Sequence, residues 1–572
     1  MINFLNTTRN FKPKHLSLQF SEVLSCNRMI RILPVLILLT LADFVHSQDR
    51  NIPPEQPRLV IGIIVSEMRY DFLNRYWDTF GEGGFKKLAS TGTVFRNAHH
   101  DYLLAESAPG YASISTGTYP DAHGIVANFW YERLKGNTRY CITDENVNTT
   151  GGSYESGRFS PSALLALNIS DQLKLSGNFK SKVFSISMDP IAAVISGGHT
   201  ANAAYWYDNY SGKWITSSFY CDSLPQWLNN FNDKDIAGTY LSQKWETLLP
   251  SEKNTDTLSN DLCDKSFPGN KGFSYDLNQL SMVSKKERNF SVLKQTPFGN
   301  TFTKDMAIST ITNEELGQNS HTDWLTVCFS ATAFTGKNFS PLSVEMQDTY
   351  LLLDKDIEHF LNFIDEYIGL KNVLIYLTAE NAIANDPSYL TAHRMPGGYF
   401  NYNSALSLLR TYLNVIYGTG DWVKFYYSQQ IYLNRELIED SRLSLSEFQD
   451  RTARFMVQFE GVSGALTAEN LMTNNYTHGV FEKMQKNYHQ ERSGDIILSL
   501  TPGWIEKGID RETASAFRYD SHVPLIFYGW KTGRTVINRN VSVTDIAPTL
   551  AILLNISRPA GTQGEVIEEL VR

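Results

Sequence analysis

Six short, continuous apolar segments constrain the fold of this chain more than any other feature of its sequence. They span residues 59–65, 183–187, 325–329, 373–377, 496–500 and 524–528. Apolar runs of this length without polar alternation are typical of strands buried on both faces, as in parallel sheets. Residues 349–367 and 545–554 carry apolar residues at helical spacing. The alternation predicts an α/β fold: a mostly parallel central sheet flanked by helices on both faces.

Two stretches, at about 200–300 and about 396–490, depart from this alternation. The first is rich in Trp, Tyr, Asn, Asp and Ser, and the second carries helices and polar loops between two expected core strands. Functional residues of such sheets lie beyond the carboxyl ends of the strands. We therefore expect one domain over 58–565, with the two stretches inserted as caps over that edge.

Composition excludes some function classes. Of 572 residues, 42% are apolar and 19% are charged, which is ordinary for a folded globular protein. The formal net charge is -9, and no run of Lys or Arg is long enough to follow a phosphate backbone. These properties argue against a nucleic-acid-binding protein.

The first 47 residues have the features of a targeting segment. Arg28 and Arg31 precede the apolar stretch 32–42, and Val45-His46-Ser47 is an acceptable cleavage site. The apolar stretch is short of the roughly 20 residues that cross a bilayer. We predict a signal peptide near residues 29–47, a linker over 48–57, and a secreted or periplasmic protein with no membrane span after cleavage. An uncleaved N-terminal anchor is the alternative.

Four cysteines would remain after removal of the leader: Cys141, Cys221, Cys263 and Cys328. No CxxC pair is present, and the spacings match no zinc site. Cys328 lies in an apolar run and is expected to be a buried thiol. If a disulfide forms, Cys221 with Cys263 is the pair to test.

An ordered set of motifs resembles one enzyme family. They include Ser107-Ala-Pro-Gly110, Asn128-Phe-Trp130, Gly299-Asn-Thr301, Asp520-Ser-His-Val-Pro524 and Thr544-Asp-Ile-Ala-Pro-Thr549. In order and spacing they resemble the alkaline phosphatase superfamily, and look most similar to secreted bacterial phosphatases of the type I phosphodiesterase/nucleotide pyrophosphatase branch. The resemblance implies hydrolysis of phosphate esters with two zinc ions and a Thr or Ser nucleophile.

The resemblance assigns two retained positions. Ser107 occupies the nucleophile position, and Asn128 occupies that of the asparagine that contacts the phosphoryl oxygen. Other readings stay open: Ser107 could cap a helix, a role Ser fills well, and Asn128 could cap a turn.

The metal positions differ from the family pattern at every ligand. Six presumed Asp and His ligands correspond to Ser66, Ala333, Lys337, Glu380, Asn381 and Thr513. The Lys-x-Arg pair that binds phosphate in the family corresponds to Met188 and Pro190. Zinc sites require Cys, His and carboxylate ligands. We therefore expect no metal and no other cofactor.

These replacements favour a catalytically inactive phosphatase homologue, a pseudoenzyme that binds an unidentified protein or small molecule through its cap. The alternative is an active phosphate-ester hydrolase with altered metal use, in which Glu380 and Glu67 hold one Mg²⁺ or Ca²⁺ and Ser107 is the nucleophile. A third reading places ligands elsewhere. For that reading the candidates are Asp71, Asp101, Asp520 and His522.

The remaining polar residues have structural interpretations. Glu380 could form an ion pair with Lys337 in place of a metal. Adjacent side chains of an extended segment point to opposite faces, so a surface role is expected for His99 and His100. His123 and His522 are expected to be hydrogen-bonded packing residues.

Overall fold

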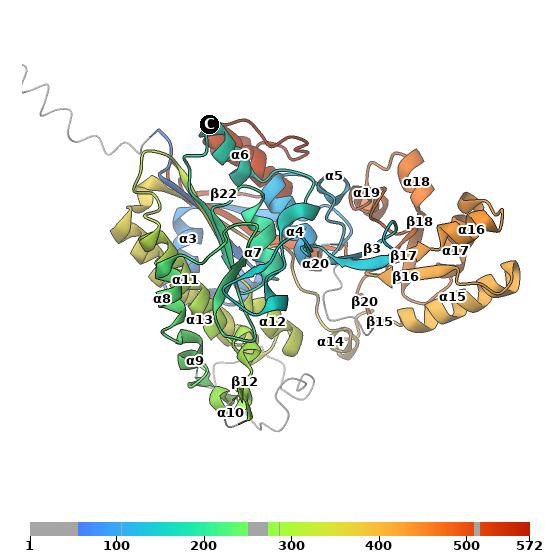
Figure 1. Cartoon of the computed structure of the whole chain (residues 1–572), viewed down its shortest axis with the longest axis horizontal. Coiled ribbons are helices and arrows are strands. Elements are labelled where there is room, and N and C mark those ends of the chain that lie inside the picture. The colour runs from blue at the N-terminus through green and yellow to red at the C-terminus, as the bar shows by residue number, and fades with distance from the viewer. Residues whose placement is uncertain (1–54, 105, 250–272, 285–286, 508–514, 572) are drawn as a thin grey trace, which may run out of the picture. The chain divides into compact units, whose positions relative to one another are not determined.

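The central sheet has eleven strands among the residues that the structure describes (Figure 1). This computed structural model describes residues 55–104, 106–249, 273–284, 287–507 and 515–571, all within the unit Pro53–Arg572. The strand order is β22 (Thr535–Ile537), β2 (Thr93–His99), β21 (His522–Gly529), β14 (Val373–Thr378), β1 (Leu59–Val65), β13 (Asp323–Phe329), β6 (Val183–Ser187), β7 (Ala203–Tyr207), β8 (Trp214–Ser217) and β5 (Thr149–Thr150), with β23 (Val541–Ser542) on β2. The leader, Cys263 and Thr513 lie outside the described residues.

Five neighbouring strands, β14, β1, β13, β6 and β7, run parallel. Their register brings the strand ends level: Ile64 lies opposite Cys328 on one side and Thr378 on the other. β21 is antiparallel to β14 and β2. The mostly parallel sheet predicted from the apolar runs is confirmed.

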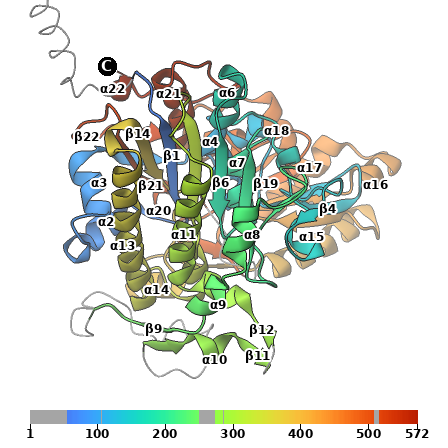
Figure 2. The ribbon, with the colours of Figure 1, turned by 60° about the vertical axis from the view of Figure 1, so that its left-hand side comes forward.

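Helices cover both faces of the sheet, as predicted. On one face, α13 (Val344–Tyr367) contacts both α3 (Phe85–Thr91) and α11 (Phe298–Asn313). Figure 2 shows α11 and α13 side by side in front of β1 and β14. α4 (Ser107–Thr116), α6 (Ile169–Ser176), α7 (Pro190–Gly197) and α21 (Ile546–Leu553) pack together on the other face. In α13 the apolar residues Leu353, Ile357, Phe360 and Ile364 are buried, because they repeat at helical spacing.

The run 496–500 belongs to a different sheet from the one expected. It forms β19 (Ile496–Leu500), between β17 (Gln430–Leu433) and β18 (Val462–Thr467) in a four-stranded antiparallel sheet completed by β16 (Val423–Tyr427). Ile496 and Leu498 pack in one apolar cluster and Ile497 in another. A strand that is buried on both faces has a continuous apolar run in either kind of sheet. The run therefore could not show which of the two sheets contains this strand.

Part of the stretch 200–300 also lies in the central sheet. β7 and β8 extend its edge, and Trp206 and Trp214 are fully buried there. These aromatic residues belong to the core of the sheet, which is why the stretch lacked a clear helical or alternating pattern. The rest of its described part includes the short pair β9 (Lys244–Glu246) and β10 (Ser274–Asp276) and the 3-10 segment Phe290–Gln295.

A hairpin connects the two sheets. β3 (Phe129–Glu132) and β4 (Asn137–Tyr140) pair with each other, and the Tyr131 ring packs on Phe425 of β16. Arg133, directly after β3, donates to the buried Asp495 at 3.3 Å, and Arg435 donates to the same carboxylate at 2.7 Å. In the part of the chain described here, none of the helices has the length and apolar character needed to span a membrane.

Candidate functional site

The carboxyl ends of four neighbouring parallel strands deliver the predicted site positions to one edge of the sheet. Ser66 follows β1, Pro190 follows β6, and Glu380 follows β14. α12 (Ala331–Asn338) begins two residues after β13 and carries Ala333 and Lys337 one turn apart. This convergence is what a parallel sheet imposes on loops that leave consecutive strands in the same direction.

A pocket of about 610 Å³ lies at this edge. Seven predicted positions line it: Ser66, Ser107, Asn128, Pro190, Ala333, Lys337 and Glu380. Met188 and Asn381 are buried but do not line the pocket. The other residues that line it, which the sequence did not single out, are Phe129, Tyr140, Asp189, Ile191, Asn209, Lys294, Ser330, Phe334 and Tyr427.

Ser107 is the first residue of α4, not its N-cap. Glu106 holds the cap position, with extended backbone, and its side chain makes no cap hydrogen bond to the helix. Asn128 Oδ1 instead accepts from the Ala108 N–H at 2.9 Å. The helix terminus therefore obtains its partner from the neighbouring loop, which leaves the Ser107 side chain at the pocket wall. The alternative that Ser107 is a cap is wrong, whereas Asn128 does satisfy a helix terminus.

Glu106 connects this helix terminus to the second sheet. Its Oε2 accepts from the Asn128 N–H at 2.8 Å, and its Oε1 accepts from the Ser428 hydroxyl. Ser428 and Gln429 form the turn between β16 and β17, and both have positive φ, 47° and 61°. Neither is a glycine, so this turn is strained. The turn holds the adjacent Tyr427 at the rim of the pocket.

The residues at the presumed ligand positions do not fit a pair of zinc ions. Ala333 has no donor atom, and Lys337 carries a positive charge. The Ser66 hydroxyl is 2.6 Å from the Tyr111 hydroxyl and hydrogen-bonds with it. Within the described ranges, no group of three or more His, Cys, Asp and Glu side chains is placed to hold a metal ion. Among the six presumed ligand positions, Glu380 is the one that carries a carboxylate.

Glu380 does not form the ion pair with Lys337 that was expected. Both of its carboxylate oxygens are buried without a hydrogen-bond partner. Burial raises the pKa of Glu380 to about 8. The Lys337 ammonium instead lies 5.6 Å from the centre of the Phe334 ring, one turn earlier on α12.

Besides Asp189, Lys294 is a charged residue of the pocket that sequence reasoning missed. Its ammonium lies 5.2 Å from the centre of the same Phe334 ring. Burial lowers the pKa of Lys294 to about 8, against the attraction of Asp189. No motif marked this lysine, because its segment precedes the helix α11 and reaches the pocket through the tertiary fold.

The displaced ligand set does not assemble among the described residues. Asp71 pairs with Arg69 at 2.7 Å, and Asp520 accepts from the backbone N–H of Ser515 at 3.0 Å. His522 stacks on Tyr70 and on His99. These three candidates are engaged in local structure instead.

The histidines near the site are packing residues. His100 is fully buried and hydrogen-bonds the carbonyl of Ala379 at 3.0 Å, so the surface role expected for it is wrong. His99 is also buried. Both histidines are buried because the chain is covered on both faces at this point. His123 is buried and hydrogen-bonds Ser113 at 3.0 Å, as expected. Cys328 is likewise buried.

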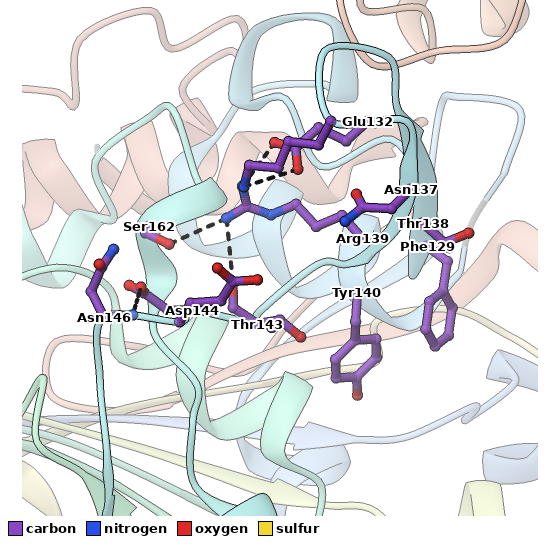
Figure 3. A pocket seen from close by; sticks show the side chains of 12 residues that line it. Phe129, Glu132, Asn137, Thr138, Arg139, Tyr140, Thr143, Asp144, Asn146 and Ser162 are labelled. Atoms are coloured by element: carbon purple, nitrogen blue, oxygen red, sulfur yellow. Dashed lines mark hydrogen bonds and ion pairs between the residues drawn. The ribbon is translucent and has the colours of Figure 1, made fainter.

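A second pocket, of about 540 Å³, shares Phe129 and Tyr140 with the first. Figure 3 shows the Arg139 guanidinium between Glu132 and Ser162. Arg139 also donates to the Thr143 carbonyl at 3.4 Å, and Asp144 accepts from the Asn146 N–H at 2.9 Å. Because these polar groups are directed at one another, this pocket is less suited to a charged ligand than the first.

The mostly parallel sheet has a pocket at its carboxyl edge, and a helix that begins with a serine contributes to that pocket. These features define an alkaline-phosphatase-like α/β protein. The Type I phosphodiesterase / nucleotide pyrophosphatase family profile matches residues 60–513, and the chain belongs to this family. It is similar to alkaline phosphatase PafA of Elizabethkingia meningoseptica, with 34% identity over 93% of this chain and 98% of that protein. Alkaline phosphatase PhoV of Synechococcus elongatus is 35% identical over 90% of this chain and 93% of its own.

The crystal structure of wild-type alkaline phosphatase PafA has the same fold. It superposes with a TM-score of 0.86, at 34% identity, and covers 91% of this chain and 100% of that one. The similarity therefore extends over both sheets.

Proposed function

We propose that this protein is a phosphatase-fold pseudoenzyme that binds a ligand in the pocket at the sheet edge and does not hydrolyse phosphate esters by the two-zinc route. One observation supports the proposal: Ser66, Ala333 and Lys337, which occupy the presumed ligand positions, line the pocket, and none of the three is a usual zinc ligand. Without metal or a neighbouring base, the Ser107 hydroxyl remains protonated and is a weak nucleophile.

The pocket nevertheless keeps the dimensions of a ligand site. Its volume of about 610 Å³ lies within the range of small-molecule sites. Residues of the hairpin β3–β4 and Tyr427 of the second sheet line it beside the strand ends. We further propose that the protein acts outside the cytoplasm, after cleavage of a signal peptide near residues 29–47.

The test uses the chain from residue 48 onward, purified without chelator. Bound metal is measured by mass spectrometry, alongside hydrolysis of an aryl phosphate monoester and a diester. We expect neither stoichiometric zinc nor turnover from folded protein. Close to two zinc ions per chain together with turnover would contradict the proposal.

A second candidate is a hydrolase of altered mechanism with Ser107 as nucleophile. It is favoured by the placement of Ser107 at the pocket wall, at the amino terminus of α4. The carboxylates that would hold a single Mg²⁺ or Ca²⁺ are Glu67 and Glu380, which are both buried. Turnover that depends on either ion and is abolished by both Ser107→Ala and Glu380→Ala would establish this candidate.

A further inference from the structure

The second pocket, on the hairpin β3–β4, is a candidate binding site separate from the one at the sheet edge. Its volume of about 540 Å³ lies within the range of small-molecule sites. The hairpin lines it together with residues 143–146 and Ser162. None of the positions that the family resemblance assigns lines this pocket. An inference about its ligand therefore does not depend on the function proposed above.

Charges of both signs line this pocket, which disfavours a charged ligand. The carboxylates belong to Glu132, Asp144 and Glu145, and the cations are Lys135 and Arg139. Glu132 lies 3.2 Å from the Lys135 ammonium and 3.4 Å from the Arg139 guanidinium. A bound anion would lie beside carboxylates, and a bound cation would lie beside the guanidinium, so either would meet repulsion. A neutral ligand avoids both costs.

The Arg139 guanidinium has hydrogen-bonding capacity that the protein uses weakly. Its hydrogen bonds to Glu132, to the Thr143 carbonyl and to Ser162 are each 3.4 Å long. Well-formed N–H···O bonds usually measure about 2.7–3.2 Å. Nε of the same side chain is buried without a hydrogen-bond partner among the described residues. Because buried N–H groups are normally satisfied, a ligand with several acceptor oxygens would complete this group.

Neutral polar groups and an aromatic surface accompany Arg139 in the lining. Asn137 and Thr138 are exposed, so a ligand can reach their amide and hydroxyl groups. Figure 3 shows the rings of Phe129 and Tyr140 next to each other, apart from the Arg139 guanidinium. The two ring centres lie 4.8 Å apart, and Phe129 is 36% exposed. The pocket thus combines hydrogen-bonding groups with an apolar surface that water reaches.

We propose that this pocket binds a neutral saccharide, with sugar hydroxyl groups on Arg139 and the carboxylates and a sugar ring against Phe129 and Tyr140. A hydroxyl group both donates and accepts, so neighbouring hydroxyls can satisfy a guanidinium and a carboxylate together. The C–H groups of a sugar ring form an apolar face, and covering an aromatic ring with it removes apolar surface from water. The absence of formal charge on the sugar suits the mixed charges of the lining.

The experiment screens the chain from residue 48 onward on an array of neutral glycans that includes maltose, cellobiose and N,N′-diacetylchitobiose. Calorimetry in EDTA then measures the affinity of each of these three disaccharides and of any other glycan that binds. We expect saturable binding of a neutral glycan and weaker binding of its sulfated and amino-bearing derivatives, because each adds a charge that the lining repels.

Two substitutions test the contacts. Arg139→Gln should weaken binding about tenfold and Asn137→Ala about threefold, as expected for one charge-assisted and one neutral hydrogen bond. The matched controls are Arg410→Gln and Asn403→Ala on α15 (Tyr402–Tyr417), which should bind as the wild type does. Both control residues are exposed, and Arg410 donates to the Val423 carbonyl at the same distance of 3.4 Å.

Three results would overturn the inference: no neutral glycan binds the folded wild type, the double variant binds with wild-type affinity, or a charged derivative binds more tightly than the neutral glycan. Melting curves show whether each variant is folded. Arg139→Lys provides a second variant, which keeps the charge but loses the planar fork and should also bind more weakly.

Repeating the titration with zinc in place of EDTA separates this site from the pocket at the sheet edge. The glycan affinity should not change, because none of the presumed metal positions lines the hairpin pocket. Glycan binding that requires zinc would place the ligand in the other pocket and contradict the inference. Turnover of a phosphate ester with zinc, together with unchanged glycan binding, would contradict the proposed function alone.

Discussion

At the scale of single residues, buried carboxylates join the second sheet to its surroundings. Glu506 is buried, and its Oε1 accepts from the Tyr426 hydroxyl and from the Gln429 N–H, while its Oε2 has no partner. Burial raises the pKa of Glu506 from its ordinary value of 4.5 to about 7. A protonated Glu506 keeps both accepted hydrogen bonds and avoids a buried charge.

The raised pKa predicts a pH-dependent loss of stability. Between about pH 4.5 and 7 the unfolded chain loses the Glu506 proton and the folded protein keeps it, so stability falls as pH rises through this window. Glu506→Gln preserves the shape without the titration. We therefore compare the free energies of unfolding of the wild type and the variant. Their difference, wild type minus variant, should decrease by on the order of 3 kcal/mol as the pH rises from 4 to 8.

Urea unfolding at both pH values measures this difference. Glu439→Gln, at an exposed position of the same region, is the control and should leave the pH dependence unchanged. Parallel pH profiles for the wild type and Glu506→Gln would show that folding does not raise the pKa of Glu506.

At the scale of elements, close backbone contact positions α4 at the sheet edge. A Cβ at Gly110 would lie 2.0 Å from the carbonyl oxygen of Glu380, which follows β14. Glycine therefore allows the first turn of α4 to contact the end of β14. This close contact and the hydrogen bond from the Ala108 N–H to Asn128 together fix the position of Ser107 relative to the strand ends.

Gly110→Ala should destabilise the protein although alanine favours helix. In an exposed helix the change would stabilise by about 1 kcal/mol. Here the added methyl overlaps backbone, and we expect a net loss of about 1–3 kcal/mol. Thermal and urea unfolding measure the loss. Gly533→Ala is the control, because no atom lies within 4 Å of its added Cβ. Equal effects of the two substitutions would argue against the close contact.

At the scale of the whole molecule, the family fold occurs together with a pocket whose residues differ from those that the family resemblance implies as metal ligands. A TM-score of 0.86 to a phosphatase structure coexists with a pocket that contains two lysines and one in-register carboxylate. An apolar core that extends from β1 to the helices on both faces stabilises this fold.

Restoring the ligands should restore zinc binding if the scaffold still holds those positions in place. The six-fold variant carries Ser66→Asp, Ala333→Asp, Lys337→His, Glu380→Asp, Asn381→His and Thr513→His. We expect it to bind zinc and to melt at a higher temperature with zinc than with EDTA, because zinc binds the folded state. Metal analysis and melting curves measure both effects.

The matched control is the same variant with Lys337 retained, which should bind zinc more weakly because an ammonium group remains beside the metal. A folded six-fold variant without bound zinc would show that the positions no longer converge as the family resemblance implies.

The sequence by itself determined the fold class, four of the five neighbouring parallel strands and seven of the sixteen residues that line the pocket. Continuous apolar runs are a local property of strands buried on both faces, so β1, β6 and β13 were evident without any knowledge of their neighbours. Motifs at the ends of those strands then placed Ser66, Ser107 and Lys337 at one edge, because parallel strands deliver their ends together.

Only the tertiary structure decided how distant segments meet. It assigned β19 to the second sheet, buried His100 against Ala379, and brought Lys294 beside Lys337 over one aromatic ring. Each of these outcomes depends on which surface covers a residue, and burial is a property of the packed chain rather than of a short segment. The same packing places Lys294, which no sequence motif marks, as a buried residue at the wall of the pocket.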